Sequence, residues 1–145
     1  MSKKLYVGFK GNNNSSHKLV ENLKGEKCFL TNSFSGLKKD IDSEYDIVYM
    51  FGLDKNLKHS IKIDKYAKQN NNIIKTEVDI SDITKRLDRY RIKYTISEQP
   101  TYYLCNEAYF HMLCKMNYRV LFFHIPPLKY LSEDLYQQLL YIFNH

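Results

Sequence analysis

The stretch RVLFFHI at residues 119–125 is the part of the sequence that decides the fold. It is almost continuously apolar, and it is stopped by two prolines, which cannot donate hydrogen bonds to a strand ladder. A second run of this kind, YDIVYMF at residues 45–51, is followed by Gly52, which we expect to end it. Such runs are typical of strands that are covered on both faces, as in a parallel sheet between two layers of helices.

Strand and helix signals alternate along the rest of the chain. Strands are predicted at residues 4–9, 27–30 and 93–96, with a weak edge strand at 61–63 and a short strand at 73–74. Amphipathic helices are predicted after the cap candidates Ser15 or Ser16, Ser35, Asp79 or Ser81, and Ser132, and from Cys105 onward. This order predicts a three-layer α/β/α sandwich with a mostly parallel central sheet, as a single domain over residues 1–145.

Composition narrows the class of protein. The chain has 145 residues, of which 43% are hydrophobic, and this is enough to form one core. No apolar run approaches the length of a membrane span, and residues 1–4 lead into a strand-like segment without a signal-peptide core. We therefore expect a soluble cytoplasmic protein with no membrane partner.

Five lysines crowd one region, namely Lys55, Lys58, Lys62, Lys65 and Lys68. A cluster of positive charge can attract an anionic partner. No nucleic-acid-binding motif accompanies it, so we prefer to interpret it as a solvated basic surface. The net charge of +6 does not by itself exclude a nucleic-acid partner.

Cys105 and His124 are the residues that most suggest chemistry. The three cysteines match no zinc motif in number or spacing, and Cys28 and Cys114 lie in apolar segments that predict packing. Cys105 opens the clearest predicted helix, where the positive helix end favours a thiolate over a thiol. His124 is near the carboxyl end of its strand and could accept or hold the thiol proton. A thiol and a histidine that merely pack in the core are the alternative interpretation.

The expected topology brings these residues together. Ligands of parallel sheets bind beyond the carboxyl ends of the strands, so we expect Gly52, the segment 97–103 and His124 to meet at one edge of the sheet. A carboxylate should orient the histidine. The candidates are Asp46, Asp54, Asp64 and Glu107, and the residues alone do not separate them.

Three segments resemble one known family. SEQPTYYLCN at 97–106, with its leading Ser, its Tyr and a Cys-Asn pair that opens a helix, resembles the nucleophile segment of the pyroglutamyl peptidases, or pyrrolidone-carboxylate peptidases. FHIP at 123–126 resembles the strand that carries the family's histidine. IKIDKYA at 61–67 resembles the carboxylate segment, with Asp64 where the family normally has Glu. The resemblance runs in order from the first strand to the last helix and indicates a shortened, divergent member.

The resemblance implies a cysteine hydrolase that removes an N-terminal pyroglutamyl or related blocked amide from a peptide or small amide substrate. It assigns Cys105 as nucleophile, His124 as general base and then acid, and Asp64 as the orienting carboxylate. It places Phe9, from the similar segment YVGF at 6–9, and Leu53 at substrate-binding positions. No metal or organic cofactor is needed, and association into homo-oligomers is a further expectation.

The chain also departs from the family. KGNNN at 10–14 replaces a second Phe and a Pro-Phe-Gly loop, Leu53 replaces a Gln, and DKN at 54–56 replaces Gly-Gly-Arg. These changes remove stacking and polar recognition of a lactam. Asp64 is also shorter than Glu by about 1 Å, and a misplacement of that size can cost about 100-fold in rate. A catalytically inactive binding protein on the same scaffold, with a protein, small-anion or nucleic-acid partner, is therefore the alternative function.

Overall fold

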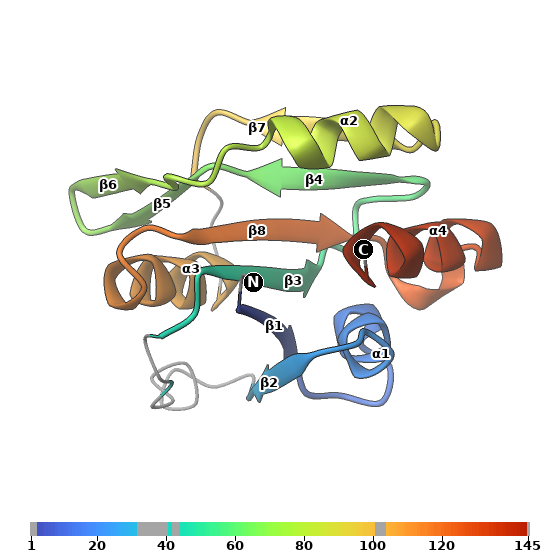
Figure 1. The fold of residues 1–145 in the computed structure, drawn as a ribbon, viewed down its shortest axis with the longest axis horizontal. Helices are drawn as coiled ribbons and strands as arrows, with labels where there is room; N and C mark the ends of the chain where they lie inside the picture. Colours follow the sequence, from blue (N-terminus) through green and yellow to red (C-terminus); the bar gives the residue numbers. More distant parts are fainter. Residues whose placement is uncertain (1–2, 32–40, 42–43, 101–103, 145) are drawn as a thin grey trace.

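The structure is a computed structural model that describes residues 3–31, 41, 44–100 and 104–144. In these ranges the main sheet has six strands in the order β2-β1-β3-β8-β4-β7, and a separate two-stranded sheet pairs β5 with β6. Helices pack on both faces of the main sheet (Figure 1). The predicted α/β fold with a mostly parallel central sheet is confirmed.

The strands are β1 (Lys4–Phe9), β2 (Glu26–Leu30), β3 (Ile47–Leu53), β4 (Ser60–Asp64), β5 (Tyr66–Gln69), β6 (Asn72–Lys75), β7 (Lys93–Ser97) and β8 (Val120–Ile125). The helices are α1 (Ser15–Glu21), α2 (Ser81–Arg89), α3 (Leu104–Lys115) and α4 (Glu133–Asn144), with a 3-10 turn η2 at Leu128–Tyr130. The cap of α1 is Asn14, whose side chain accepts from the Ser16 backbone N–H, and not a serine. Apart from Ile41, the helix predicted after Ser35 lies outside the described residues.

The two apolar runs form the centre of the sheet. β3 and β8 pair in parallel, and every residue of β8 is buried. The expectation that Gly52 ends its strand is wrong, because β3 continues to Leu53. A Cβ on Gly52 would lie 2.8 Å from the Phe122 ring and 2.9 Å from the Cys105 sulfur. This glycine therefore makes room for side chains from β8 and α3.

The expectation of an edge strand at 61–63 is also wrong. β4 lies inside the sheet, antiparallel to β8 and parallel to β7. Ile61 and Ile63 are fully buried on one face. The polar residues that alternate with them, Lys62 and Asp64, suggested a solvated face, but in the structure they face the layer that contains α3.

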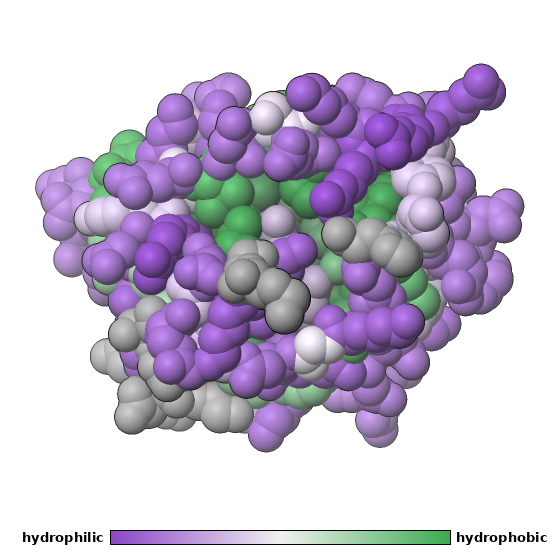
Figure 2. All heavy atoms as spheres, in the orientation of Figure 1, coloured by the Kyte–Doolittle hydropathy of each residue, from purple (hydrophilic) through white to green (hydrophobic). Residues whose placement is uncertain are grey.

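Two hydrophobic clusters hold the layers together. One cluster joins α1, α2 and α4 to one face of the sheet, and the other joins α3 to the opposite face. Figure 2 shows that hydrophilic side chains dominate the surface in the view of Figure 1, with hydrophobic residues visible in hollows between them. None of the described helices combines the length and apolarity needed to cross a membrane.

Candidate active site

The candidate site lies on the face of the sheet that α3 covers. Alternation of side chains along each strand puts Gly52 of β3, His124 of β8, and Lys62 and Asp64 of β4 on this one face. In the registers of the sheet, Gly52 and Lys62 are the neighbours of His124 on its two sides. The central strands thus deliver a cation, an imidazole and a carboxylate to one place.

The expectation that the site gathers at one carboxyl edge needs correction. β4 and β7 run opposite to β3 and β8, so the carboxyl end of β7 does not share an edge with that of β8. Ser97, the last residue of β7, is level with Asp64, which is in turn level with Phe122 inside β8. The site is therefore spread over the sheet face, and Gln99 and Pro100, which follow β7, line the pocket beside it.

Asp64 and His124 form a buried pair. The Nε2 of His124 lies 2.5 Å from Oδ2 of Asp64, and the two residues are only 4% and 1% exposed. A carboxylate oxygen accepts, so the ring donates from Nε2–H to Asp64, and Nδ1 is the ring nitrogen left to accept a proton. That Nδ1 atom is buried and has no hydrogen-bond partner within the described part of the chain. The pair thus presents an unengaged base, which is the arrangement that orients a catalytic histidine.

The other carboxylate candidates are placed differently. Asp46 accepts from the Lys3 backbone N–H, before the start of β3. Asp54 lies in the pocket and forms an ion pair with Lys62, with Oδ2 3.6 Å from the ammonium nitrogen. Among the carboxylates in the described residues, Asp64 is the one that contacts His124.

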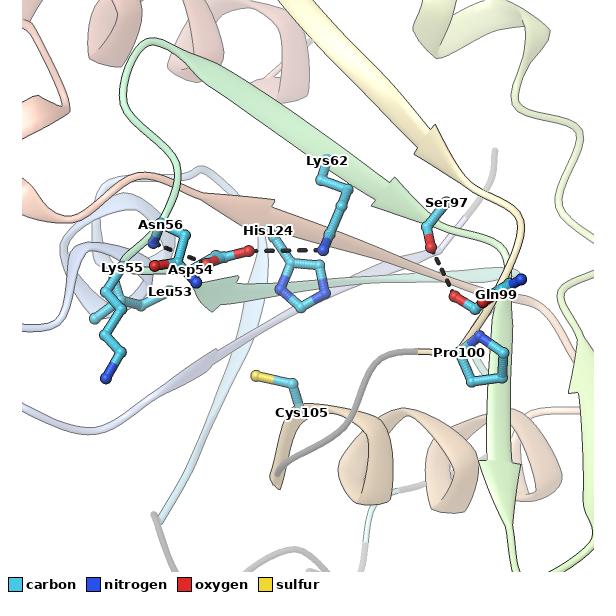
Figure 3. Close-up of a pocket in the computed structure, with 10 residues that line it drawn as sticks. All are labelled: Leu53, Asp54, Lys55, Asn56, Lys62, Ser97, Gln99, Pro100, Cys105 and His124. Atoms are coloured by element: carbon cyan, nitrogen blue, oxygen red, sulfur yellow. Dashed lines mark hydrogen bonds and ion pairs between the residues drawn. The ribbon is translucent and has the colours of Figure 1, made fainter.

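Cys105 brings a half-buried thiol to the same place. It lies in the first turn of α3, and its sulfur occupies the space left by the missing side chain of Gly52. Figure 3 shows the thiol pointing from α3 into the pocket below the imidazole of His124. The structure therefore brings together Cys105, His124 and Asp64, which the sequence had singled out.

The electrostatic environment of the thiol opposes ionisation. Burial raises the pKa of Cys105 from 9.0 to about 12, and the carboxylates of Asp64 and Asp54 act in the same direction. The ammonium of Lys62 acts in the opposite direction. Burial thus outweighs the expected effect of the helix start, and the resting side chain at neutral pH is a thiol.

Two side chains of α3 fix the helix next to the sheet. The amide of Asn106 makes a two-bond fork with the backbone of Lys68, accepting from its N–H at 2.8 Å and donating to its C=O at 2.7 Å. The hydroxyl of Tyr109 donates to the backbone C=O of Asp64 at 2.8 Å. These contacts tie the helix that carries the thiol to β5 and to the residue that contacts the histidine.

A pocket of about 570 Å³ opens beside the thiol. The residues that line it are Leu53, Asp54, Lys55, Asn56, Lys62, Ser97, Gln99, Pro100, Cys105 and His124 (Figure 3). Leu53 therefore lies where the resemblance placed a substrate contact. Phe9 does not line this pocket; it is 3% exposed and packs in the cluster between the sheet and α3.

Sequence reasoning missed Lys62 as a part of the site, and it considered Asp54 only as a candidate for the carboxylate that orients the histidine. Lys62 had been assigned to a solvated basic surface. A signal existed, because residues two apart on a strand share a face, so the choice of Asp64 already implied that Lys62 projects beside it. No group of three or more His, Cys, Asp and Glu side chains within the described ranges could hold a metal ion.

The fold is that of known peptidases. The chain matches the crystal structure of pyrrolidone carboxyl peptidase from Thermus thermophilus with a TM-score of 0.78 and 17% identity, over 98% of this chain and 99% of that chain. It matches pyroglutamyl peptidase I from Bacillus amyloliquefaciens with a TM-score of 0.77 and 15% identity, over 99% and 96% of the two chains. A mutant pyrrolidone carboxyl peptidase from Pyrococcus furiosus matches with a TM-score of 0.72 and 18% identity, over 97% of this chain and 93% of that chain. No protein-family model and no curated protein sequence matches the chain.

Proposed function

We propose that the protein is a cysteine hydrolase of the pyroglutamyl-peptidase type, which cleaves an N-terminal pyroglutamyl group or a related blocked amide. The observation that carries the proposal is the buried pair of Asp64 and His124 behind a thiol that opens into a pocket. A buried carboxylate and imidazole are costly to desolvate, so a core without chemistry gains little from keeping them. The shared fold of the solved peptidases supports the same assignment.

In this proposal the thiol is activated by a base during the reaction. The Cys105 sulfur attacks the amide carbonyl while its proton passes to Nδ1 of His124. Asp64 stabilises the imidazolium that results and keeps its Nε2–H oriented. The imidazolium then protonates the leaving amine, and water hydrolyses the thioester. The raised pKa of Cys105 favours this route over a preformed thiolate.

Hydrolysis of a fluorogenic pyroglutamyl amide, beside a panel of other N-acyl amides, tests the proposal. We expect turnover by the wild type and its loss in Cys105→Ala. Cys114→Ala is the matched control, because that cysteine is exposed near the end of the same helix. Wild-type rates equal to those of Cys105→Ala on every amide would reject the hydrolase.

One observation favours a second function, a catalytically inactive binding protein on the same scaffold. The pocket presents the cations Lys55 and Lys62 next to a thiol whose ionisation is suppressed, which suits the binding of a small anion. Titration calorimetry with phosphate and with acetate tests this alternative. Micromolar binding that is lost in Lys62→Gln, together with no amide turnover, would support the binding protein over the enzyme.

A further inference from the structure

We propose that Lys62 is the anion-stabilising residue of the site and that Asp54 holds its ammonium in position. The inference rests on the proposed function, because it names the group that neutralises the charge developing in the attack by Cys105. It assigns a role to a lysine that belongs, by sequence, to a basic surface.

The backbone places Lys62 beside the reacting groups. It is directly opposite His124 in the antiparallel pair of β4 and β8, and it shares a face with Asp64 two residues later. Its side chain is 26% exposed and lines the pocket that contains the thiol. Figure 3 shows it descending from β4 toward Asp54, on the same side of the sheet as His124 and Cys105.

The ion pair with Asp54 fixes the position of the ammonium. The carboxylate of Asp54 is 20% exposed, and its other oxygen accepts from the Asn56 backbone N–H at 2.9 Å. The carboxylate is therefore anchored by its own loop. A partly buried, anchored pair orients a long flexible side chain better than an exposed pair does.

The charges around the thiol require a cation. Asp64 from β4 and Asp54 from the loop after β3 both disfavour negative charge on the sulfur. Lys62 opposes them, and Lys55 and His124 are the other basic groups that line the pocket. Charge that develops during attack would meet two carboxylates and a low dielectric, and a fixed ammonium in such a setting is worth more than in water.

The step that Lys62 would assist is the addition to the carbonyl. A bond forms between the Cys105 sulfur and the carbonyl carbon, and the C=O π bond breaks and leaves its electron pair on oxygen. The thiol proton moves to Nδ1 of His124. The products are an oxyanion and an imidazolium. The imidazolium is paired with Asp64, whereas the oxyanion needs its own counter-charge, which Lys62 supplies.

Alkylation of Cys105 tests the inference without any need for turnover. Iodoacetamide is neutral and iodoacetate carries a negative charge, and peptide mass spectrometry separates Cys105 from the other cysteines. We expect Lys62→Gln to lower the rate with iodoacetamide at pH 8 about tenfold, which corresponds to one pKa unit in the thiolate population. We expect the rate with iodoacetate to fall further, because the attraction for the anionic reagent is also lost.

Three further variants sharpen the test. Lys62→Arg should restore both rates, and Lys62→Gln should lower them less in the Asp54→Asn background, where the ion pair no longer holds the ammonium in position. Lys65→Gln is the matched control: Lys65 is similarly half-buried and pairs with Glu98 at 3.5 Å, but it does not line the pocket. Unfolding curves establish that each variant is folded.

The outcomes separate this inference from the proposed function. If Lys62→Gln reacts like the wild type with both reagents, the inference is overturned, even where amides are hydrolysed. If the alkylation rates change as expected while no amide is cleaved, the electrostatic role of Lys62 stands and the hydrolase assignment fails. If the control Lys65→Gln shows the same loss as Lys62→Gln, the effect comes from general surface charge and the inference is overturned.

Discussion

The sulfur of Cys105 occupies the space that a side chain on Gly52 would need. A Cβ built on Gly52 would lie 2.9 Å from that sulfur, closer than real Cβ contacts allow. Since Gly52 is the register neighbour of His124, this contact places the thiol beside the imidazole. A backbone position inside a central strand therefore determines where the thiol lies.

Gly52→Ala should displace the thiol. The methyl group would also lie 2.8 Å from the Phe122 ring, so we expect a loss of about 1–3 kcal/mol in the free energy of unfolding. We also expect the rate of amide hydrolysis to fall about 100-fold, the effect of a displacement near 1 Å in a reacting group. Urea denaturation and steady-state kinetics measure the two effects.

Gly8→Ala is the control for this prediction. A Cβ at Gly8 would lie 3.0 Å from the Ser16 carbonyl and from the Val20 side chain, which is also crowded, but these neighbours belong to α1 on the other side of the sheet. This variant should lose stability and keep its turnover per folded molecule. Equal turnover in Gly52→Ala and the wild type would show that the thiol is not positioned by this contact.

Asp64→Asn should abolish most of the activity while the protein still folds. The amide can still accept from the histidine, but it carries no charge to stabilise the imidazolium, and it can donate and so hold the wrong tautomer. The corresponding change in serine proteases lowers kcat about 10⁴-fold. We expect a fall of at least about 100-fold here, in kcat rather than KM, measured beside Asp46→Asn as a control. A change confined to KM would argue that Asp64 acts in substrate binding.

Local signals in the sequence single out Cys105 and His124, whereas the choice of Asp64 among four carboxylates rests on the family resemblance. An apolar stripe at helical spacing marks the helix of Cys105, and a continuous apolar run marks the strand of His124. The environment of Lys62 has no local signal in the sequence. It depends on the antiparallel pairing of β4 with a strand about 60 residues away in sequence. A strand in which apolar and polar residues alternate is predicted to lie at the edge of a sheet, unless its polar residues are known to face a buried site.

Two other differences between expectation and structure, at Phe9 and at Cys105, also arise from packing between segments that are far apart in the sequence. Phe9 has the sequence context of a substrate contact, but its burial is decided by what packs above the sheet. The raised pKa of Cys105 is set by burial and by carboxylates from two other elements, whereas the position of a residue on its own helix reports only the helix charge. Local pattern thus singles out Cys105 and His124, whereas packing between distant segments determines which other residues join them and how the thiol ionises.

The thiol of Cys105 should make stability depend on alkaline pH. Its pKa in the folded state is about 12, above the 9.0 of an unperturbed thiol, so the folded state prefers the protonated form. The stabilisation is fully present below pH 9 and is lost as the pH rises from 9 toward 12, with a slope of up to about 1.4 kcal/mol per pH unit for one proton.

Comparison with Cys105→Ala isolates this effect. Burial also raises the pKa of Tyr49 to about 12, but that tyrosine is common to both proteins and its contribution cancels. We expect the difference in the free energy of unfolding, wild type minus variant, to be constant from pH 7 to 8.5 and to shrink above pH 9. Chemical denaturation at a series of pH values measures it. A difference that does not vary up to pH 11 would mean that the folded thiol ionises normally.

The fork between Asn106 and the backbone of Lys68 should fix the start of α3. Asn106→Ala leaves the N–H and C=O of Lys68 without the partners they have in the structure, at a cost of about 1–3 kcal/mol each where they stay buried. Asn106→Asp should be at least as harmful, because a carboxylate can accept from the N–H but repels the carbonyl oxygen. Since Asn106 follows Cys105 directly, Asn106→Ala should also expose the thiol and speed its alkylation, because burial is the main cause of its raised pKa. Hydrogen exchange at the Lys68 amide reports the local loosening, and Asn22→Ala, which removes an exposed bond to the Lys18 carbonyl, is the control. If the Lys68 amide exchanged no faster in Asn106→Ala than in the control, α3 would have to be held to the hairpin by its apolar contacts alone.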